Sequence, residues 1–230
     1  MITIIIQPLI DIIFMKQINT ESEIKNVYNL IILDESGSMH SIYMPALSGV
    51  NETLQTIRTA NKEHKDQRHF VSLVTFNTES YNVIYKTALA EKTSDITNKQ
   101  YCPNGGTPLY DAMAKSINDL RSVVSENDMV LVTIITDGYE NASREYNGKA
   151  IKVLVENMKN IGWVFTYIGA NQDVEAVASS LSINNHLHFD ADLEGTREMF
   201  AKESKSRKSF FSRISLNLSH DKLADNYFED

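Results

Sequence analysis

The chain has 230 residues, of which 42% are hydrophobic, and it carries a formal net charge of −8 at pH 7. This length is enough for one α/β core, and an acidic chain is poorly suited to non-specific nucleic-acid binding, which needs a positive surface. The single cysteine, Cys102, excludes an internal disulfide and any metal site built from several cysteines. A chain with a single cysteine is compatible with a reducing compartment, and we expect a cytoplasmic protein.

The apolar segment at residues 2–14 is too short to span a membrane. A spanning helix needs about 20 apolar residues, and here a glutamine, a proline and an aspartate interrupt the run. A secretory signal would have a basic residue before the run and a small-residue cleavage site after it, and neither is present. We therefore interpret residues 1–27 as a leader or an extra strand. A poor signal or membrane-surface segment, and a translation start at Met15, are the alternatives.

Continuous apolar runs rich in β-branched residues predict buried strands. Each run is apolar on both faces, which is typical of a sheet covered by helices on both sides. The runs lie at residues 30–33, 71–76, 129–135 and 163–168. After the second run, residues 77–80 predict a tight turn into a further strand over 81–86, antiparallel to the second and at an edge of the sheet.

Helical periodicity fills the segments between the strands. Apolar residues recur at three- and four-residue steps, which predicts helices over 45–60, 109–124, 150–161 and 173–181. Pro108 suits the first turn of the second helix, and Asn171 is the expected cap of the last one. Alternating strands and helices with right-handed crossovers predict a doubly wound, Rossmann-like α/β fold. We expect its sheet to be mostly parallel, with one antiparallel edge strand and helices on both faces.

Residues 191–230 are predicted to form a helical tail behind a domain that spans 28–190. A helix is expected over 193–214, with several phenylalanines and with a basic stretch at 202–208 in an otherwise acidic chain. Such a helix could contact a partner or an anionic surface. The favoured interpretation is that it packs back on the domain and leaves its lysines in solvent. The last ten residues are expected to be frayed.

Three polar loops carry the chemistry that the sequence offers. Asp34, Ser36 and Ser38 follow the first buried strand at alternate positions. Thr107 lies in a Gly-Gly-Thr-Pro segment before the second helix, and Asp137 follows the third buried run. In a doubly wound sheet with strand order 3-2-1-4-5-6, these loops meet where the order reverses, and ligands bind there. Their carboxylates and hydroxyls suit a hard cation, Mg²⁺ or alternatively Mn²⁺ or Ca²⁺.

The first loop, together with segments 105–112 and 136–138, resembles the von Willebrand factor type A family and its metal-ion-dependent adhesion site. The resemblance covers residues 28–189, and segment 167–173 is similar to small bacterial and phage members. It implies a bacterial or phage protein-binding module. The sequence does not match the inserted domains or long repeats of the adhesive extracellular members, so the resemblance supports the metal site more strongly than a role in cell adhesion.

The resemblance also implies a role for each oxygen ligand. The two serines are direct ligands, the threonine is direct or switching, and the two aspartates act directly or through water. A cation held mainly by neutral oxygens stays electrophilic, so it takes a carboxylate from a partner in its open position. The implied function is metal-dependent recognition of an acidic side chain on a protein partner, with no nucleic acid and no membrane span involved.

Two other functions stay open at this point. Intracellular members of the family suggest an accessory subunit of an ATPase or a modification system, with the metal site as the contact. A metal-dependent hydrolase or phosphatase is less favoured, because a phosphatase would have an aspartate where this chain has Ser36 and because no histidines cluster around the motif. We therefore expect the chain not to be an enzyme.

Residues beside the motif carry weaker expectations. Glu35 is expected to point to solvent, where it would repel acidic surfaces near the metal. Cys102 is expected to be a semi-exposed loop thiol, because no base partner for it is recognisable. Trp163 and Phe165 are expected to lie in the core.

Overall fold

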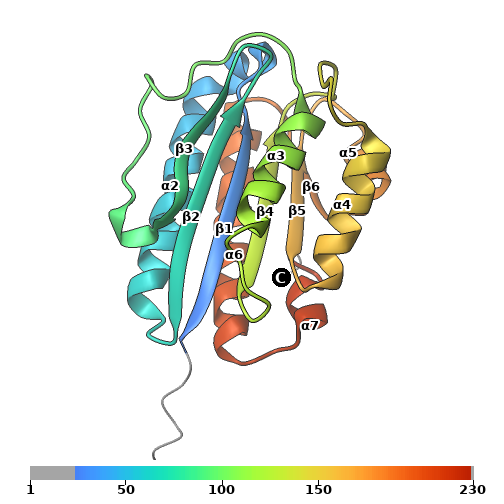
Figure 1. Cartoon of the computed structure of the whole chain (residues 1–230). Helices are drawn as coiled ribbons and strands as arrows, with labels where there is room; N and C mark the ends of the chain where they lie inside the picture. Colours follow the sequence, from blue (N-terminus) through green and yellow to red (C-terminus); the bar gives the residue numbers. More distant parts are fainter. Residues whose placement is uncertain (1–23, 229–230) are drawn as a thin grey trace, which may run out of the picture.

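The computed structural model describes residues 24–228, which form a six-stranded sheet between two layers of helices (Figure 1). The strand order is β3-β2-β1-β4-β5-β6. β1 (Lys25–Asp34) pairs in parallel with β2 (Gln67–Phe76) on one side and with β4 (Met129–Thr136) on the other. Most of the predicted leader, including the possible start at Met15, lies outside the described residues.

The remaining strands extend the sheet to both edges. β3 (Tyr81–Leu89) runs antiparallel to β2 after the predicted turn, while β5 (Val164–Gly169) and β6 (Asn185–His188) continue parallel from β4. The predicted doubly wound sheet, mostly parallel with one antiparallel edge strand, is thus confirmed. β6 was not predicted, because its four residues are half-buried or exposed and carry little apolar pattern.

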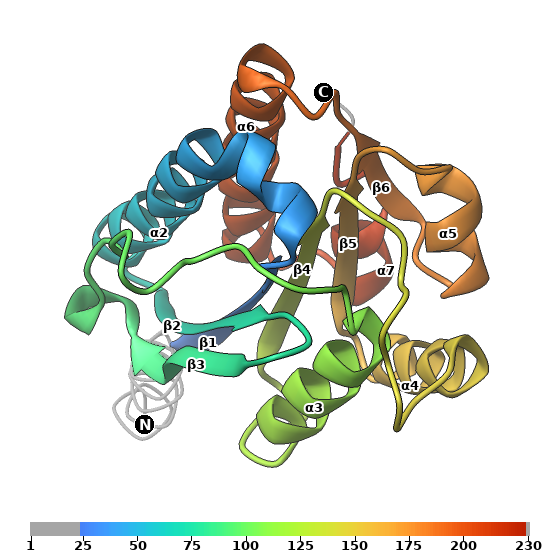
Figure 2. The same ribbon diagram turned by 90° about the horizontal axis from the view of Figure 1, so that it is seen from above.

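A layer of helices covers each face of the sheet; in the view from above, α2 and α6 lie on one side and α3 and α4 on the other (Figure 2). The first layer consists of α2 (Tyr43–Glu63), α6 (Leu193–Ser215) and α7 (His220–Ala224). The second consists of α3 (Leu109–Arg121), α4 (Gly148–Asn160) and α5 (Val174–Ser180). Two short 3-10 helices lie in the connections, η1 (Gly37–Ile42) and η2 (Ala90–Lys92). Within the described part of the chain, none of the helices is long and apolar enough to cross a bilayer.

The side chains of β1 alternate between two separate cores, one under each helical layer. Ile31 and Leu33 lie in the core with α2 and α6, whereas Leu30 and Ile32 lie in the core with α3 and α4. All four are at most 1% exposed. A strand with two buried faces is apolar along most of its length, and this is why the continuous apolar run predicted it correctly.

α6 packs against α2 and fills the same core. Phe210 and Phe211 are buried and the lysines of the basic stretch are exposed, so the favoured interpretation of this helix is confirmed. The expectation of a frayed end is wrong for the last residues that the structure describes. α7 follows α6, and Leu223 within it and Tyr227 beyond it are buried because they close the end of this core.

The cap of α5 lies two residues beyond the expected one. Asp173 is the capping residue, because its carboxylate accepts a hydrogen bond from the backbone N–H of Ala176 at 3.0 Å. The expected cap at Asn171 is therefore wrong. Asn171 instead adopts a left-handed backbone conformation, with a φ of 54°, in the turn that follows β5.

An ion pair within α6 is completely buried against the sheet. Arg207 Nε and Nη2 each lie 2.7 Å from Glu203 Oε1, and both side chains are 0% exposed. Arg207 also donates to Asn29 Oδ1 of β1 and to Thr133 Oγ1 of β4, each at 2.8 Å. The hydroxyl of Tyr227 donates to Glu203 at 3.3 Å. The only guanidinium in the predicted basic stretch is therefore a core group and not a solvated charge.

His69 of β2 is buried beneath α6, and neither of its ring nitrogens has a hydrogen-bond partner. Its ring meets the ring of Phe211 in a T-shaped contact with centroids 4.4 Å apart. Burial lowers the pKa of His69 to about 3; the charges of His64 and Arg207 act in the same direction, and Asp66 opposes them. The folded protein therefore keeps this imidazole neutral.

Acidification from pH 7 to pH 5 is expected to destabilise the protein by about 2 kcal/mol through His69 alone. The unfolded chain binds a proton below pH ~6.5 that the folded protein refuses. The contribution of His69 to stability is therefore fully present above pH ~6.5, and it is lost as the pH drops toward 3. His69→Leu removes the titrating ring and its unpaired nitrogens. Urea unfolding at the two pH values should give a smaller loss for this variant, and equal losses would contradict the interpretation.

Candidate metal centre

Polar loops meet at the carboxyl ends of β1 and β4, which is the point where the strand order reverses. Ser38 Oγ donates to Asp137 Oδ1 at 2.5 Å, and the hydroxyl oxygens of Ser36 and Ser38 lie 3.1 Å apart. The backbone N–H of Gly37 donates to the carbonyl of Gly105 at 2.9 Å, which joins the threonine loop to the serine loop. The structure thus brings the three predicted loops together.

Asp34 is the last residue of β1, and its carboxylate is held from two sides. Oδ1 accepts a hydrogen bond from the backbone N–H of Ser36 at 2.7 Å, and Oδ2 accepts one from Thr136 Oγ1 at 2.6 Å. Burial raises the pKa of Asp34 to about 6, although the bonds from Thr136 and Ser36 oppose the rise; the charge of Asp137 adds to it. Hydrogen bonds thus fix the position of the Asp34 carboxylate, but they offset the cost of burying its negative charge only in part.

Asp137 follows β4 and is 1% exposed. Oδ1 accepts the bond from Ser38, whereas Oδ2 is buried without a hydrogen-bond partner. Burial raises the pKa of Asp137, and the bond from Ser38 offsets the rise only in part. Within residues 24–228, neither Asp34 nor Asp137 forms an ion pair. Buried charges in proteins are normally paired or bound to a metal. A cation at this point would compensate the negative charge of the two carboxylates.

Thr107 is fixed through its main chain. Its N–H donates to Asn141 Oδ1 at 2.9 Å, and the N–H of Asn141 donates to the carbonyl of Thr107 at 3.1 Å. Asn141 belongs to the loop after Asp137, so this pair joins the second and third loops. Sequence reasoning missed Asn141, because an asparagine in an exposed loop carries no periodic pattern or motif that would single it out.

Two glycines allow the loops to approach one another. Gly105 has a φ of +68°, and a Cβ there would lie 2.3 Å from Thr78 Oγ1. A Cβ at Gly37 would lie 3.3 Å from the carbonyl oxygen of Gly105. The first position needs glycine for its backbone conformation, and both need it for space.

Glu35 points into the protein, so the expectation that it faces solvent is wrong. It is 3% exposed, and its carboxylate accepts hydrogen bonds from Thr75 Oγ1 at 2.6 Å and from the backbone N–H of Cys102. The side chain is buried because at this position the chain passes between β2 and the threonine loop. Cys102 itself is exposed, as expected.

The donor set fits a hard divalent cation. In the part of the chain that the structure describes, no group of three or more His, Cys, Asp or Glu side chains could hold a metal, so a cation at this point would also need hydroxyl ligands. Hydroxyls and carboxylates are suited to Mg²⁺, Mn²⁺ or Ca²⁺ rather than to zinc or iron. Asp137 Oδ2, which is buried and has no partner, provides an acceptor for the ion. The five predicted ligands therefore stay a prediction that the geometry accommodates.

The sequence matches no known family profile and no curated protein. Solved structures nevertheless share the fold. The PilB minor pilin from Streptococcus sanguinis is 14% identical with a TM-score of 0.58, over 83% of this chain and 63% of that chain. The chain thus spans less than two thirds of the pilin.

Two further structures are themselves von Willebrand factor domains. The vWF domain of the type V pili tip protein Mfa5 from Porphyromonas gingivalis is 10% identical with a TM-score of 0.53, over 85% of this chain and 97% of that chain. The SpRpn10 VWA domain is 11% identical with a TM-score of 0.51, over 76% of this chain and 94% of that one. Identities this low establish the fold alone, and the fold of this chain is that of a von Willebrand factor A domain.

Proposed function

We propose that this chain is a divalent-cation-dependent module that binds a protein partner through an acidic side chain of that partner. One observation carries the proposal. Within residues 24–228, Asp34 and Asp137 are buried carboxylates without an ion pair, and they lie with the hydroxyl groups of Ser36 and Ser38 at the switch point of the sheet. A cation at this point compensates both charges and still has a position open for a ligand.

The contacts of the predicted ligands separate those that would hold the ion directly from those that already have hydrogen-bond partners. The hydroxyls of Ser36 and Ser38, and Oδ2 of Asp137, are the groups that would hold the ion directly. Both oxygens of Asp34 already accept hydrogen bonds. Asp34 would therefore hold Ser36 in place or contact the ion through a water molecule. The main chain of Thr107 is held by Asn141, in the loop after Asp137. The bound ion supplies an electrophilic centre for a carboxylate.

The charge of the protein explains why such recognition depends on the metal. The chain has a formal net charge of −8, and the centre of the site adds two buried carboxylates. An acidic partner is therefore repelled by the metal-free protein. The cation reverses the sign of the potential at the point where the partner's carboxylate docks, so binding without metal is expected to be negligible.

Proteins with the same fold support an interaction role only by analogy, since one fold serves many functions. Those compared above are a minor pilin, a pilus tip domain and a VWA domain. A cytoplasmic location, a bacterial origin and the absence of enzymatic activity stay predictions. An accessory subunit of an ATPase or modification system stays the alternative, and it uses the same site.

Saturating Mg²⁺ is expected to raise the melting temperature of the wild-type protein but not that of Asp34→Asn. A ligand that binds only the folded state adds about 2.7 kcal/mol of stability at a concentration 100 times its Kd. Asparagine keeps the size of the side chain and removes the charge. The control is Asp95→Asn, which removes the same charge from a carboxylate that is 62% exposed and paired with Arg58. If Mg²⁺ raises the melting temperature of Asp34→Asn as much as that of the wild type, the assignment of the site is wrong.

Partner binding is tested by affinity capture from the native host with wild type, Asp34→Asn and Asp95→Asn, each in Mg²⁺ and in EDTA. A protein retained by wild type and Asp95→Asn only in Mg²⁺ supports the proposal, and an ATPase among such proteins favours the accessory alternative. Capture that ignores both metal and mutation would assign binding to a different surface.

A further inference from the structure

The carboxylate of Glu35 joins three parts of the structure at one buried point. Oε2 accepts hydrogen bonds from Thr75 Oγ1 of β2 at 2.6 Å and from Asn82 Nδ2 of β3 at 3.3 Å. Oε1 accepts one from the backbone N–H of Cys102, in the loop that leads to Thr107. Thr75 and Asn82 are register partners, so Glu35 holds this end of the hairpin and the threonine loop against the first loop of the metal centre.

The chain at residues 101–105 runs alongside the turn at 34–37. The buried hydroxyl of Tyr101 donates to the carbonyl of Asp34 at 3.0 Å. The backbone N–H of Asn104 donates to the carbonyl of Glu35, and the N–H of Gly37 donates to Gly105, both at 2.9 Å. With the bond from Cys102 to the Glu35 carboxylate, these contacts fix the path of the chain immediately before Thr107.

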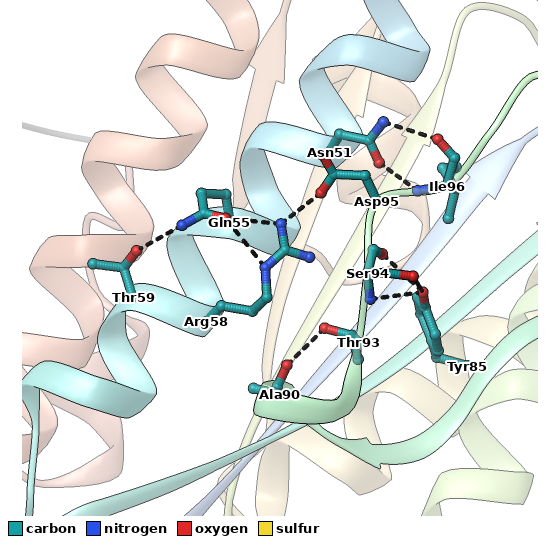
Figure 3. Close-up of polar contacts among 10 residues, drawn as sticks. All are labelled: Asn51, Gln55, Arg58, Thr59, Tyr85, Ala90, Thr93, Ser94, Asp95 and Ile96. Carbon is teal, nitrogen blue, oxygen red and sulfur yellow. Dashed lines mark hydrogen bonds and ion pairs between the residues drawn. The ribbon is translucent and has the colours of Figure 1, made fainter.

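The same connection is attached to α2 farther upstream (Figure 3). The side-chain amide of Asn51 donates to the carbonyl of Ile96 at 3.0 Å and accepts from its N–H at 2.8 Å. Arg58 Nη2 pairs with Asp95 Oδ1 at 2.5 Å. Among the attachments of the segment between β3 and α3, one tether thus joins it to α2 around residues 95–96, and a second joins it to Glu35 around residue 102. Only the second tether borders the metal centre.

We propose that Glu35 is a positioning residue that sets the affinity of the centre for its cation. It holds the threonine loop in register with Ser36 and Ser38 before the ion arrives, and this inference rests on the proposed metal site. Preorganised ligands bind a metal more tightly because less motion is lost on binding. Removing a residue that orients metal ligands typically lowers metal affinity by about 10–100-fold.

Isothermal titration of the full chain with Mg²⁺ tests the role of Glu35. Glu35→Ala is expected to raise the Kd at least about tenfold. Glu35→Gln keeps an oxygen for the N–H of Cys102 and is expected to stay within about threefold of wild type, because amide and hydroxyl groups at Asn82 and Thr75 can reorient. Asn51→Ala is the matched control: it removes the two hydrogen bonds to Ile96 from the upstream tether, so it should lower the melting temperature and leave the Kd unchanged.

Each outcome separates this inference from the proposed function. Wild type that binds no Mg²⁺ overturns both. Wild type that binds, with Glu35→Ala at the same Kd, overturns the positioning role and leaves the metal site standing. A rise in Kd for Asn51→Ala as large as that for Glu35→Ala also overturns it, because general loosening of the connection would then explain the effect. If Glu35→Ala does not fold, Glu35→Asp replaces it, since its shorter side chain no longer reaches Cys102, and the same criterion applies.

Discussion

Arg207→Met is expected to lower the free energy of unfolding by about 3–5 kcal/mol. The substitution leaves Glu203 as a buried carboxylate without its cation, and it also removes the donors to Asn29 and Thr133. Both members of the pair are 0% exposed, so water cannot take the place of the lost partner without opening the core. Urea unfolding followed by far-UV circular dichroism measures the loss.

The double variant Glu203→Leu/Arg207→Met separates an uncompensated charge from lost packing. If the uncompensated charge causes the loss, the double variant regains most of the stability, because replacing a buried pair by apolar groups is often neutral or stabilising. Lys208→Met is the control for a cation lost from the same helix, and its exposed position predicts a change within about 0.5 kcal/mol. A double variant as unstable as Arg207→Met would contradict this account.

Gly49→Ala is expected to destabilise the protein by about 3 kcal/mol, although alanine favours a helix over glycine by about 1 kcal/mol. Gly49 of α2 lies against the ring of Phe200 of α6, and a Cβ there would lie 1.9 Å from Cδ2 of Phe200. Phe200 is 2% exposed, so its ring has no free space to enter. The helices must separate or the ring must leave its rotamer, and either change disturbs the shared core.

A double-mutant cycle with Phe200→Leu tests whether the clash is the cause. The smaller side chain creates room beside residue 49, so Gly49→Ala is expected to cost at least 1 kcal/mol less in the Phe200→Leu background. Thermal or urea unfolding of the four proteins gives the coupling energy. Additive effects would mean that the alanine disturbs α2 itself and not the contact with α6.

Most of the fold could be predicted from the sequence because the central strands are buried on both faces. The unbroken apolar run at Leu30–Leu33 has no other stable environment in a soluble α/β protein, and the periodic helices around it follow from the same burial. β6 (Asn185–His188) escaped prediction for the opposite reason. It lies at an edge, is half-buried or exposed, and owes its structure to pairing with β5 rather than to its own pattern.

The residues of the candidate metal centre could be named from short motifs, since Asp34, Ser36 and Ser38 lie in one turn and Thr107 and Asp137 each occupy a recognisable loop. The side chains that connect these loops could not be named. Their roles depend on partners far along the chain: Glu35 on Cys102, and Asn141 on Thr107.

Arg207 shows the same limit most clearly. In the sequence it sits among exposed lysines and was assigned with them to a basic stretch. Only the packing of α6 across β1 and β4 brings Asn29 and Thr133 to its guanidinium and makes burial of the charge tolerable. Local pattern identifies which helix is amphipathic, but it does not identify a charge whose partners lie on other elements.

The placement of α6 has a consequence for synthesis on the ribosome. β1 ends at Asp34, yet the helix that covers Ile31 and Leu33 together with α2 begins only at Leu193. At about 5–20 residues per second, translation from Asp34 to Leu193 takes roughly 8–30 s. During that interval the nascent sheet has one incompletely covered apolar face. The growing chain must therefore be shielded from its neighbours until α6 is made.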